Sequence, residues 1–265
     1  MVNSTYNKIM ENLRFLKSKE SLDVLDKTID YVTLNKLSFI EGFLYFTEAQ
    51  MERKRENLMT HAVLMAGFPK IKTLNDFDFD YQPSINKAQI EDFKSLRFIE
   101  SKENIVFFGN SGVGKTHLAI AIGVTAAQNR QSTYFMKCSD LIAALHKAKL
   151  EDRLQDKLKK LASYKVLIID ELGYLPISKD DSKLFLELID RRYEKYSTII
   201  TTNINFSQWD EIFGDAVIAN AILDRILHHS HIVTIKGKSY RLQHLYNDGE
   251  LSERKNKEIT NTIGE

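Results

Sequence analysis

Several residue types that often determine the character of a chain are scarce in this sequence of 265 residues. Its single cysteine, Cys138, excludes an internal disulfide, and its three prolines favour long uninterrupted helices. The net charge of +1 means that any affinity for nucleic acid must come from local basic clusters. The N-terminus is polar and no apolar run is long enough to span a bilayer, so we expect a cytoplasmic protein without a membrane partner.

The stretch 109–116 carries the strongest signal that is present. Its sequence, GNSGVGKT, matches the pattern G-x-x-x-x-G-K-T of a nucleotide-binding P-loop. A short apolar strand is predicted before it at 104–108, and a helix after it at 117–128. A chain of this length matches the pattern by chance on the order of one time in a hundred, and the flanking strand and helix lower that further. The sequence therefore predicts nucleotide binding.

Each residue type in this loop has a physical role. Glycines allow a tight turn that directs backbone N–H groups at a phosphate, and the helix N-terminus favours the same anion. Lys115 is expected to reach the β- and γ-phosphates of ATP, and the Thr116 hydroxyl to hold Mg²⁺. The predicted nucleotide contacts are Gly109, Asn110, Ser111, Gly112, Val113, Gly114, Lys115, Thr116 and His117.

A second motif follows at 165–171, with the sequence KVLIIDE. Four apolar residues followed by two acids are typical of a central parallel strand with carboxylates at its C-terminal edge, where α/β sheets bind ligands. Asp170 is expected to support Mg²⁺, and Glu171 to orient and activate a water molecule for hydrolysis. The alternative for Glu171 is an ordinary surface carboxylate at the end of a strand.

Two further polar positions have competing interpretations. Asn203 follows the predicted strand 197–202, where its side chain could hold the attacking water or the γ-phosphate, or could form an ordinary turn. Arg191 and Arg192 lie near the end of a helix predicted over 180–196. They are interpreted either as partners of the helix dipole or as subunit contacts.

The remaining patterns divide the chain into four parts. Residues 1–68 show apolar residues at helical spacing, and we interpret them as a small helical domain that contacts DNA or a partner. Residues 69–86 are expected to form an irregular aromatic linker that docks on the next domain. Residues 87–247 are expected to form the ATPase domain, beginning with a helix over 87–99, and the polar residues 248–265 to be disordered.

Basic residues recur at steps of three and four between 140 and 162, where the pattern is helical with a break or bend near Glu151. On a continuous helix they would form one stripe. The stripe is either a solvated face or a surface that tracks DNA phosphates, and the residues alone leave both open. Its members are His146, Lys149, Arg153, Lys157 and Lys160.

Three histidines, His228, His229 and His231, lie close together near the start of the last predicted strand, 231–235. A helix predicted over 216–227 precedes them. We do not predict a metal site here, because no cysteine is near and the segment is a helix end that enters a strand.

Taken together, these motifs resemble the IstB-type ATP-binding helper proteins of insertion sequences. The resemblance is carried by GNSGVGKTHLAIAIG, LIIDELGYLP, SKLFLELIDRRYEKYSTIITTN, AILDRILHHSHIV and GKSYRL, and it extends over nearly the whole chain. The wider group is the AAA+ initiator and helicase-loader clade, which includes DnaC-type loaders. The resemblance implies a DNA-binding AAA+ ATPase that assembles with ATP on target DNA, deforms it and recruits a partner transposase.

The resemblance also implies roles for individual residues. The clade's DNA-contacting insertion falls on the basic stripe. The usual helical lid has no room after Ile235, so its sensor 2 arginine is missing unless Arg241 replaces it. The matched positions are Lys115 and Thr116 for Walker A, Asp170 and Glu171 for Walker B, Asn203 for sensor 1, and Arg225 for an arginine finger at the subunit edge.

Residues and resemblance together predict an α/β fold, an AAA+ P-loop ATPase with a parallel five-stranded sheet flanked by helices, plus a small all-helical N-terminal domain. The expected cofactors are ATP and Mg²⁺, and the expected partners are double-stranded DNA, a transposase and further copies of the chain in an ATP-dependent homo-oligomer. The alternatives are a DnaC-type replicative helicase loader and a nucleotide-dependent switch or small-molecule kinase. Glu171 after Asp170 argues against the second alternative, because it indicates water as the acceptor.

Overall fold

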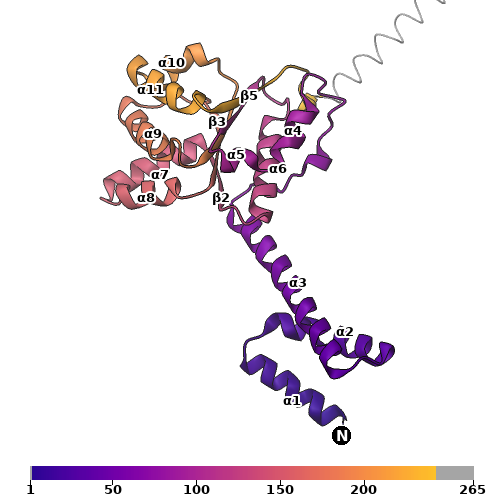
Figure 1. Cartoon of the computed structure of the whole chain (residues 1–265). Coiled ribbons are helices and arrows are strands. Elements are labelled where there is room, and N and C mark those ends of the chain that lie inside the picture. Colours follow the sequence, from indigo (N-terminus) through magenta and orange to yellow (C-terminus); the bar gives the residue numbers. More distant parts are fainter. Residues whose placement is uncertain (1, 243–265) are drawn as a thin grey trace, which may run out of the picture. The chain divides into compact units, whose positions relative to one another are not determined.

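The structure is a computed structural model that describes residues 2–242 (Figure 1). The chain divides into two compact units, one ending at His61 and the other beginning at Ala62. The polar tail predicted over 248–265 lies outside the described residues. No helix in residues 2–242 combines the length and the apolar character needed to cross a membrane.

The first unit consists of helices, as the sequence predicts. Its buried apolar side chains are few and include Val24 and Leu25, while many large apolar residues are exposed. A Cβ atom on Gly42 would lie 2.9 Å from a methyl carbon of Val32, so this glycine allows the second and third helices to approach closely. The helices are α1 (Val2–Phe15), α2 (Lys19–Asn35) and α3 (Phe39–Met65), the last of which continues into the second unit.

The second unit is built on the predicted parallel five-stranded sheet. The strand order is β2-β3-β4-β1-β5, and every pairing is parallel. The central strands β3 and β4 are almost wholly buried, as expected for strands covered on both faces. The strands are β1 (Asn104–Gly109), β2 (Thr133–Lys137), β3 (Val166–Leu172), β4 (Ser197–Thr202) and β5 (Ser230–Ile235).

Helices cover both faces of the sheet, with α4, α5 and α6 on one side and α7 to α11 on the other (Figure 1). Each face has its own apolar core, because alternate strand residues point to opposite faces. Ile168 of β3 belongs to the core beneath α6, while Leu167 and Ile169 belong to the other. The helices are α4 (Lys87–Phe93), α5 (Arg97–Glu100), α6 (Lys115–Gln128), α7 (Cys138–Leu150), α8 (Leu154–Ala162), α9 (Lys179–Arg192), α10 (Trp209–Phe213) and α11 (Ala216–Leu227), with short 3-10 turns η1 (Leu74–Asp76), η2 (Phe206–Gln208) and η3 (Tyr240–Leu242).

The helix predicted over 87–99 is wrong as a single element. It is interrupted at Leu96, whose φ of 61° is left-handed. On a continuous helix Phe98 would lie about 140° round from Phe93, since each residue turns by about 100°. The interruption instead buries both rings in one core, with their centroids 6.1 Å apart. Burial of aromatic surface therefore overrides the local helical pattern.

The break predicted near Glu151 is confirmed. Helix α7 ends at Leu150 and α8 begins at Leu154, with Asp152 between them at a left-handed φ of 52°. The change of direction lets both helices bury their leucines, including Leu145 and Leu158, in the same core. The basic stripe is consequently divided between two helices.

Candidate nucleotide-binding site

The loop between β1 and α6 has the backbone conformation that its glycines allow. Gly112 and Gly114 have left-handed φ values of 81° and 104°. A Cβ atom on Gly114 would lie 2.5 Å from Cε2 of Phe77, and one on Gly112 would lie 2.0 Å from Oγ of Ser239. Any side chain at either position would therefore strain the backbone and displace a neighbouring segment.

The Lys115 side chain lies folded over this loop. Its ammonium group donates hydrogen bonds to the backbone oxygens of Gly109 and Asn110, both at 2.7 Å. Burial lowers the pKa of Lys115, while the negative charge of Asp170 opposes that shift. The ammonium group thus bonds carbonyl oxygens of a loop that is suited to hold phosphate oxygens.

Asp170 lies at the centre of a short hydrogen-bond network. Its Oδ1 accepts a bond of 2.7 Å from the Thr116 hydroxyl and one of 2.6 Å from the Thr201 hydroxyl. The side chain is only 2% exposed, and burial raises the pKa of the carboxyl while the two hydroxyl donors oppose the shift. A buried carboxylate beside a hydroxyl is an oxygen-rich donor set of the kind that Mg²⁺ prefers.

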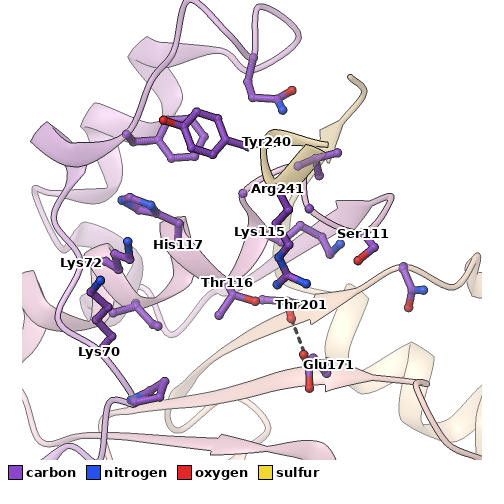
Figure 2. Close-up of a pocket in the computed structure, with 18 of the residues that line it drawn as sticks. Lys70, Lys72, Ser111, Lys115, Thr116, His117, Glu171, Thr201, Tyr240 and Arg241 are labelled. Atoms are coloured by element: carbon purple, nitrogen blue, oxygen red, sulfur yellow. Dashed lines mark hydrogen bonds between the residues drawn. The ribbon is translucent and has the colours of Figure 1, made fainter. Parts of the chain in front are cut away.

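Glu171 lines a cavity beside the P-loop because β3 is irregular at this residue. The register between β3 and β4 shifts between Ile169 and Leu172, and Glu171 has a left-handed φ of 60°. Its backbone N–H donates to the Thr201 hydroxyl at 2.9 Å (Figure 2). Its carboxylate is paired with the Lys137 ammonium at 2.9 Å. Non-glycine residues held at positive φ are found preferentially at functional sites.

Thr201 and Lys137 are two functional residues that the sequence analysis missed. Thr201 joins the two acids, because its hydroxyl donates to Asp170 and accepts from the Glu171 backbone. Lys137 is in register with Asp170 across β2 and β3, so it lies at the same sheet edge. Thr201 is the last residue but one of the predicted strand 197–202, and this position near a strand end was the available signal. Lys137 is the last residue of β2.

These groups open into a cavity of about 700 Å³, a size usual for small-molecule sites. Its walls come from the P-loop, the ends of β3 and β4, and two covering segments, one around residues 69–82 and one at 240–241 (Figure 2). The predicted site residues that line it are Ser111, Gly112, Val113, Gly114, Lys115, Thr116, His117, Glu171, Asn203 and Arg241.

The covering segment before the sheet is attached through aromatic contacts. The His117 Nε2 group donates to the Thr73 backbone oxygen at 2.8 Å, and its ring meets Phe77 edge-on with centroids 5.2 Å apart. Burial lowers the pKa of His117, so the ring favours its neutral form. Phe77 packs in turn on Phe79, with centroids 4.9 Å apart.

The covering segment after β5 closes the opposite edge. The Tyr240 backbone N–H donates to the Gly112 oxygen at 2.9 Å, and the Gln82 amide donates to the Lys238 oxygen at 2.9 Å. Arg241 lines the cavity, and its charge lowers the pKa of Lys115. Figure 2 shows Arg241 on the same side of the cavity as Lys115. An arginine therefore lies close enough to the P-loop lysine for their charges to interact, and it comes from the 3-10 turn η3.

Arg225 is not among the residues that line the cavity. Its guanidinium group bonds Asp190 of α9 at 2.6 Å and the Ala221 oxygen at 3.0 Å, and the side chain is 30% exposed. Arg225 is therefore partly exposed on a helix surface and does not line the cavity of its own subunit. A finger role would require it to act in the site of a neighbouring subunit. The role of Asp190 as its partner was not anticipated, because the two residues are far apart in sequence.

The interpretation of Arg192 as a subunit contact is wrong. Its side chain is 1% exposed and donates to the backbone oxygens of Leu161, Ala162, Tyr164 and Ser197 and to the Thr198 hydroxyl. Burial lowers its pKa to about 9, which still leaves the guanidinium charged at neutral pH. Arg192 therefore joins α8, the segment between α8 and β3, and β4 inside the subunit. Arg191 pairs with Glu187 at 2.8 Å.

The structure does not bring the basic stripe onto one helix. His146 lies 2.8 Å from Asp181, and Arg153 pairs with Glu151, so two of the five residues already have an acidic partner. Lys149 and Lys160 are exposed, and Lys157 is half-buried. His146 and Lys149 lie on α7, Arg153 lies in the turn that follows, and Lys157 and Lys160 lie on α8, so the five residues do not form one continuous row.

The sheet order, the P-loop after β1 and the acids at the end of β3 define the class of protein. This is an AAA+ P-loop nucleotide-binding fold. The crystal structure of the DnaC helicase loader is similar over 56% of this chain and 87% of that chain, with a TM-score of 0.50 and 28% identity. The crystal structure of DnaI has a TM-score of 0.54 at 22% identity over 62% of this chain and 91% of that chain, which supports the fold alone.

Sequence comparison gives the family. The family model described as IstB-like ATP binding protein matches residues 15–247, and the chain belongs to this family. A protein of insertion sequence IS232 from Bacillus thuringiensis subsp. berliner is 53% identical over 240 residues, covering 91% of this chain and 96% of the relative. One of IS21 from Pseudomonas aeruginosa is 40% identical over 247 residues, covering 92% and 93%. Both names propose ATP binding. The predicted resemblance and fold class are confirmed.

Proposed function

We propose that this protein is a Mg²⁺-dependent ATPase that assembles with ATP on double-stranded DNA, deforms it and recruits the transposase of its insertion sequence. The observation that carries the proposal is the network in which Thr116 and Thr201 hold Asp170 beside Glu171, facing the P-loop. Membership of the IstB-like ATP-binding family and the names of the insertion-sequence relatives support it.

The phosphate chain of ATP would be held by the backbone N–H groups of the loop and by Lys115. To bind phosphate, the Lys115 ammonium exchanges its two carbonyl contacts at 2.7 Å for charged oxygens. The donor is charged in both cases, but a phosphate oxygen also carries negative charge, so the exchange adds an attraction between opposite charges and favours the bound state. Arg241 adds a second positive group from the segment after β5.

Thr116 and Asp170 are the residues that would hold Mg²⁺. The donor set fits the ion, because Asp170 is desolvated and its charge is balanced only by hydroxyl donors and more distant cations. Held by these two residues, Mg²⁺ would supply positive charge close to the phosphate groups. The Thr201 hydroxyl would keep the carboxylate in place and keep Glu171 at a fixed distance from it.

Glu171 is the proposed general base. One of its two carboxylate oxygens, Oε2, is paired with the Lys137 ammonium at 2.9 Å. In the proposed activation, Glu171 leaves Lys137 and turns toward the γ-phosphate, where it can accept a proton from the attacking water. Asn203, at the cavity edge, is suited to orient the same water through its amide.

Arg225 is proposed to complete the site of a neighbouring subunit. Its permanent charge and planar fork suit phosphate oxygens, and its present partner, Asp190, is 58% exposed. An exposed ion pair is worth at most about 1 kcal/mol, so a phosphate can compete for the arginine. Hydrolysis then depends on contact between subunits.

DNA binding is proposed for the surface around the α7–α8 turn, through His146, Lys149, Arg153, Lys157 and Lys160. Two of these groups already have acidic partners, so binding requires phosphates to compete with Asp181 and Glu151. Such competition is favourable at low salt because DNA releases its own counterions.

Phosphate release with and without duplex DNA tests the proposal. We expect hydrolysis that requires Mg²⁺ and is altered by DNA, together with capture of the transposase by the ATP-bound assembly. ATP binding without phosphate release under any of these conditions would contradict the ATPase, and would favour a nucleotide-dependent switch.

A replicative helicase loader is the second candidate, because the DnaC helicase loader is 28% identical over the aligned region. The two functions share the ATPase cycle and differ in the recruited protein. A pull-down with the ATP-bound protein against purified transposase and purified replicative helicase separates them, and capture of the helicase alone would favour the loader.

A further inference from the structure

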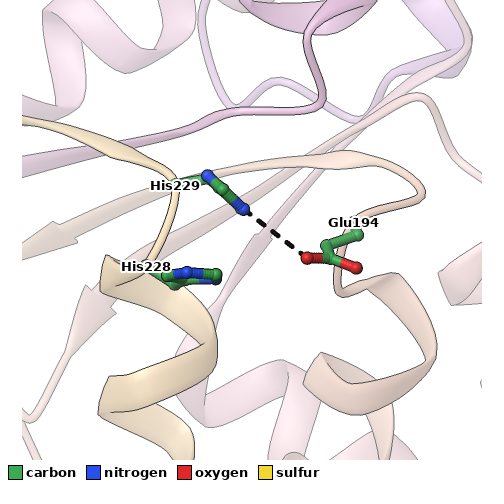
Figure 3. Close-up of side chains that lie close together, drawn as sticks. All are labelled: Glu194, His228 and His229. Carbon is green, nitrogen blue, oxygen red and sulfur yellow. Dashed lines mark ion pairs between the residues drawn. The ribbon is translucent and has the colours of Figure 1, made fainter.

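A second group of ligand-type side chains lies outside the nucleotide cavity. Glu194 comes from the turn between α9 and β4, and His228 and His229 come from the end of α11 (Figure 3). One ligand atom from each of the three lies within 4.8 Å of the other two. All three side chains are exposed, so an ion could reach them from solvent.

The distances suit a transition-metal ion. Zn²⁺ binds nitrogen and oxygen ligands at about 2.0–2.2 Å, so two ligand atoms of a tetrahedral site are about 3.3–3.5 Å apart. His229 Nε2 and Glu194 Oε1 are 3.5 Å apart. The ring centroids of His228 and His229 are 4.0 Å apart, so the second imidazole also lies close to this pair.

A hydrogen bond to the Tyr193 hydroxyl also orients the ring of His228. Its Nδ1 shares a hydrogen bond of 2.6 Å with the Tyr193 hydroxyl, which leaves Nε2 as the nitrogen free to bind an ion. Histidine ligands of metal ions usually have such a partner on the second ring nitrogen, because it fixes the tautomer and the ring plane. The two rings of this pair lie 6.0 Å apart and nearly parallel.

The cluster continues a row of contacts between α9 and α11. Asp190 bonds Arg225, and one turn further along both helices Tyr193 bonds His228. The third contact, between Glu194 and His229, is the only one of the three that pairs two metal-ligating groups. The two helix ends are thus already held at the separation that an ion would require.

We propose that Glu194, His228 and His229 form a binding site for a borderline divalent cation of the Zn²⁺ class. Two imidazoles and one carboxylate are a donor set for Zn²⁺ rather than Mg²⁺, which prefers oxygen. Three protein ligands leave a fourth position for water or another ligand. The proposal departs from the expectation of no metal site at His228, His229 and His231, because Glu194 supplies the third group while His231 bonds Glu103, at 3.0 Å.

The test uses the full-length protein, stripped of metal by a chelator and kept in millimolar Mg²⁺ so that Asp170 is not a competing site. Titration with Zn²⁺ by calorimetry should give one equivalent, and Co²⁺ should give the visible absorption of a low-coordinate site. Cys138 does not compete, because burial raises the pKa of its thiol to about 12.

His229→Ala and Glu194→Gln should each weaken Zn²⁺ binding at least tenfold, and Tyr193→Phe by less, because it only orients a ligand. His146→Ala is the matched control, since His146 also lies beside a carboxylate, Asp181, at 2.8 Å. It should leave the affinity unchanged.

Absence of saturable Zn²⁺ binding by the wild type overturns the proposal. So does equal weakening by His146→Ala, which would indicate adventitious surface binding. The isosteric Glu194→Gln keeps the test valid if an alanine variant unfolds, and thermal midpoints of the metal-free variants identify that case. Retained affinity and Co²⁺ absorption in a folded Glu194→Gln protein would also overturn it.

Discussion

The nucleotide cavity and the basic surface around the α7–α8 turn are organised in opposite ways. In the cavity wall, Asp170 has hydrogen-bond partners in α6 and β4, and Thr201 of β4 has two partners in β3. On the basic surface, Arg153 and His146 have one acidic neighbour each and stand in solvent. Removal of a cavity side chain is therefore expected to abolish most of the ATP hydrolysis. Removal of one surface charge should weaken DNA binding by a small amount that depends on salt.

Arg225 offers the strongest test of that contrast. It does not line the cavity of its own subunit, yet its replacement should have the largest effect on ATP hydrolysis. Arg225→Ala should lower ATP hydrolysis by about 10³-fold or more if the arginine acts in a neighbouring site. Steady-state phosphate release at several protein concentrations measures this, and the wild-type rate should rise more steeply than linearly with concentration.

Mixing Arg225→Ala with Lys115→Ala distinguishes action between subunits from a folding defect. Each variant alone should be inactive, while the mixture should recover part of the activity at interfaces with an intact P-loop and an intact arginine. Arg191→Ala is the comparison variant and should remain active. No recovery in variants that still co-assemble on DNA would transfer the finger role to Arg191.

Glu171→Gln should produce the next largest effect. Removing the base should reduce hydrolysis about a hundredfold or more, since general base catalysis contributes on that order. ATP binding should remain, so the variant should accumulate as an ATP-bound assembly on DNA. Fluorescent-nucleotide binding and phosphate release measure the two properties separately. Glu211→Gln, at an exposed acid of α10, is the control, and near wild-type hydrolysis by Glu171→Gln would remove Glu171 from the role.

Replacing Lys149, Arg153, Lys157 and Lys160 by alanine should have a graded effect. If each contacts a phosphate, the slope of log affinity against log salt should decrease in magnitude by about 3 to 4, and all duplexes should be affected alike. Fluorescence anisotropy over a series of salt concentrations gives the slope. Arg97→Ala with Lys102→Ala, two exposed positions near α5, should leave it unchanged. An unaltered slope in the fourfold variant would identify the surface as merely solvated.

Lys137→Met should have the smallest effect and the opposite sign. The pair with Glu171 is about half exposed, and such pairs contribute about 1 kcal/mol at most, which corresponds to roughly a fivefold change in rate. Releasing the carboxylate should raise hydrolysis in the absence of DNA. The ratio of rates with and without DNA should fall accordingly. A decrease in both rates would show that Lys137 positions Glu171 rather than restraining it.

The parts of the fold that could be predicted are those whose signals are local. The strand before the P-loop, the two acids of β3 and the break near Glu151 each depend on a few adjacent residues, and the structure has all of them. The interruption at Leu96 could not be predicted in this way, because it depends on the packing of Phe98 against a distant core.

The candidate site divides along the same line. Lys115 and Thr116 are recognisable from their motif, whereas Thr201 has no motif and acquires its role only when β4 lies beside β3. The buried position of Arg192 could likewise not be predicted, because the carbonyl groups that it bonds come mostly from a segment about 30 residues earlier. Residues that act through partners distant in sequence require the sheet order before they can be assigned.

The bond from the Tyr240 N–H to the Gly112 oxygen has a consequence for synthesis of the protein. Gly112 leaves the ribosome long before Tyr240, and chains grow at about 5–20 residues per second. For several seconds the P-loop therefore exists without the segment that closes its far edge. A nascent chain cannot form the complete cavity before Arg241 has emerged, so the cavity is completed only after all five strands of the sheet have been synthesised.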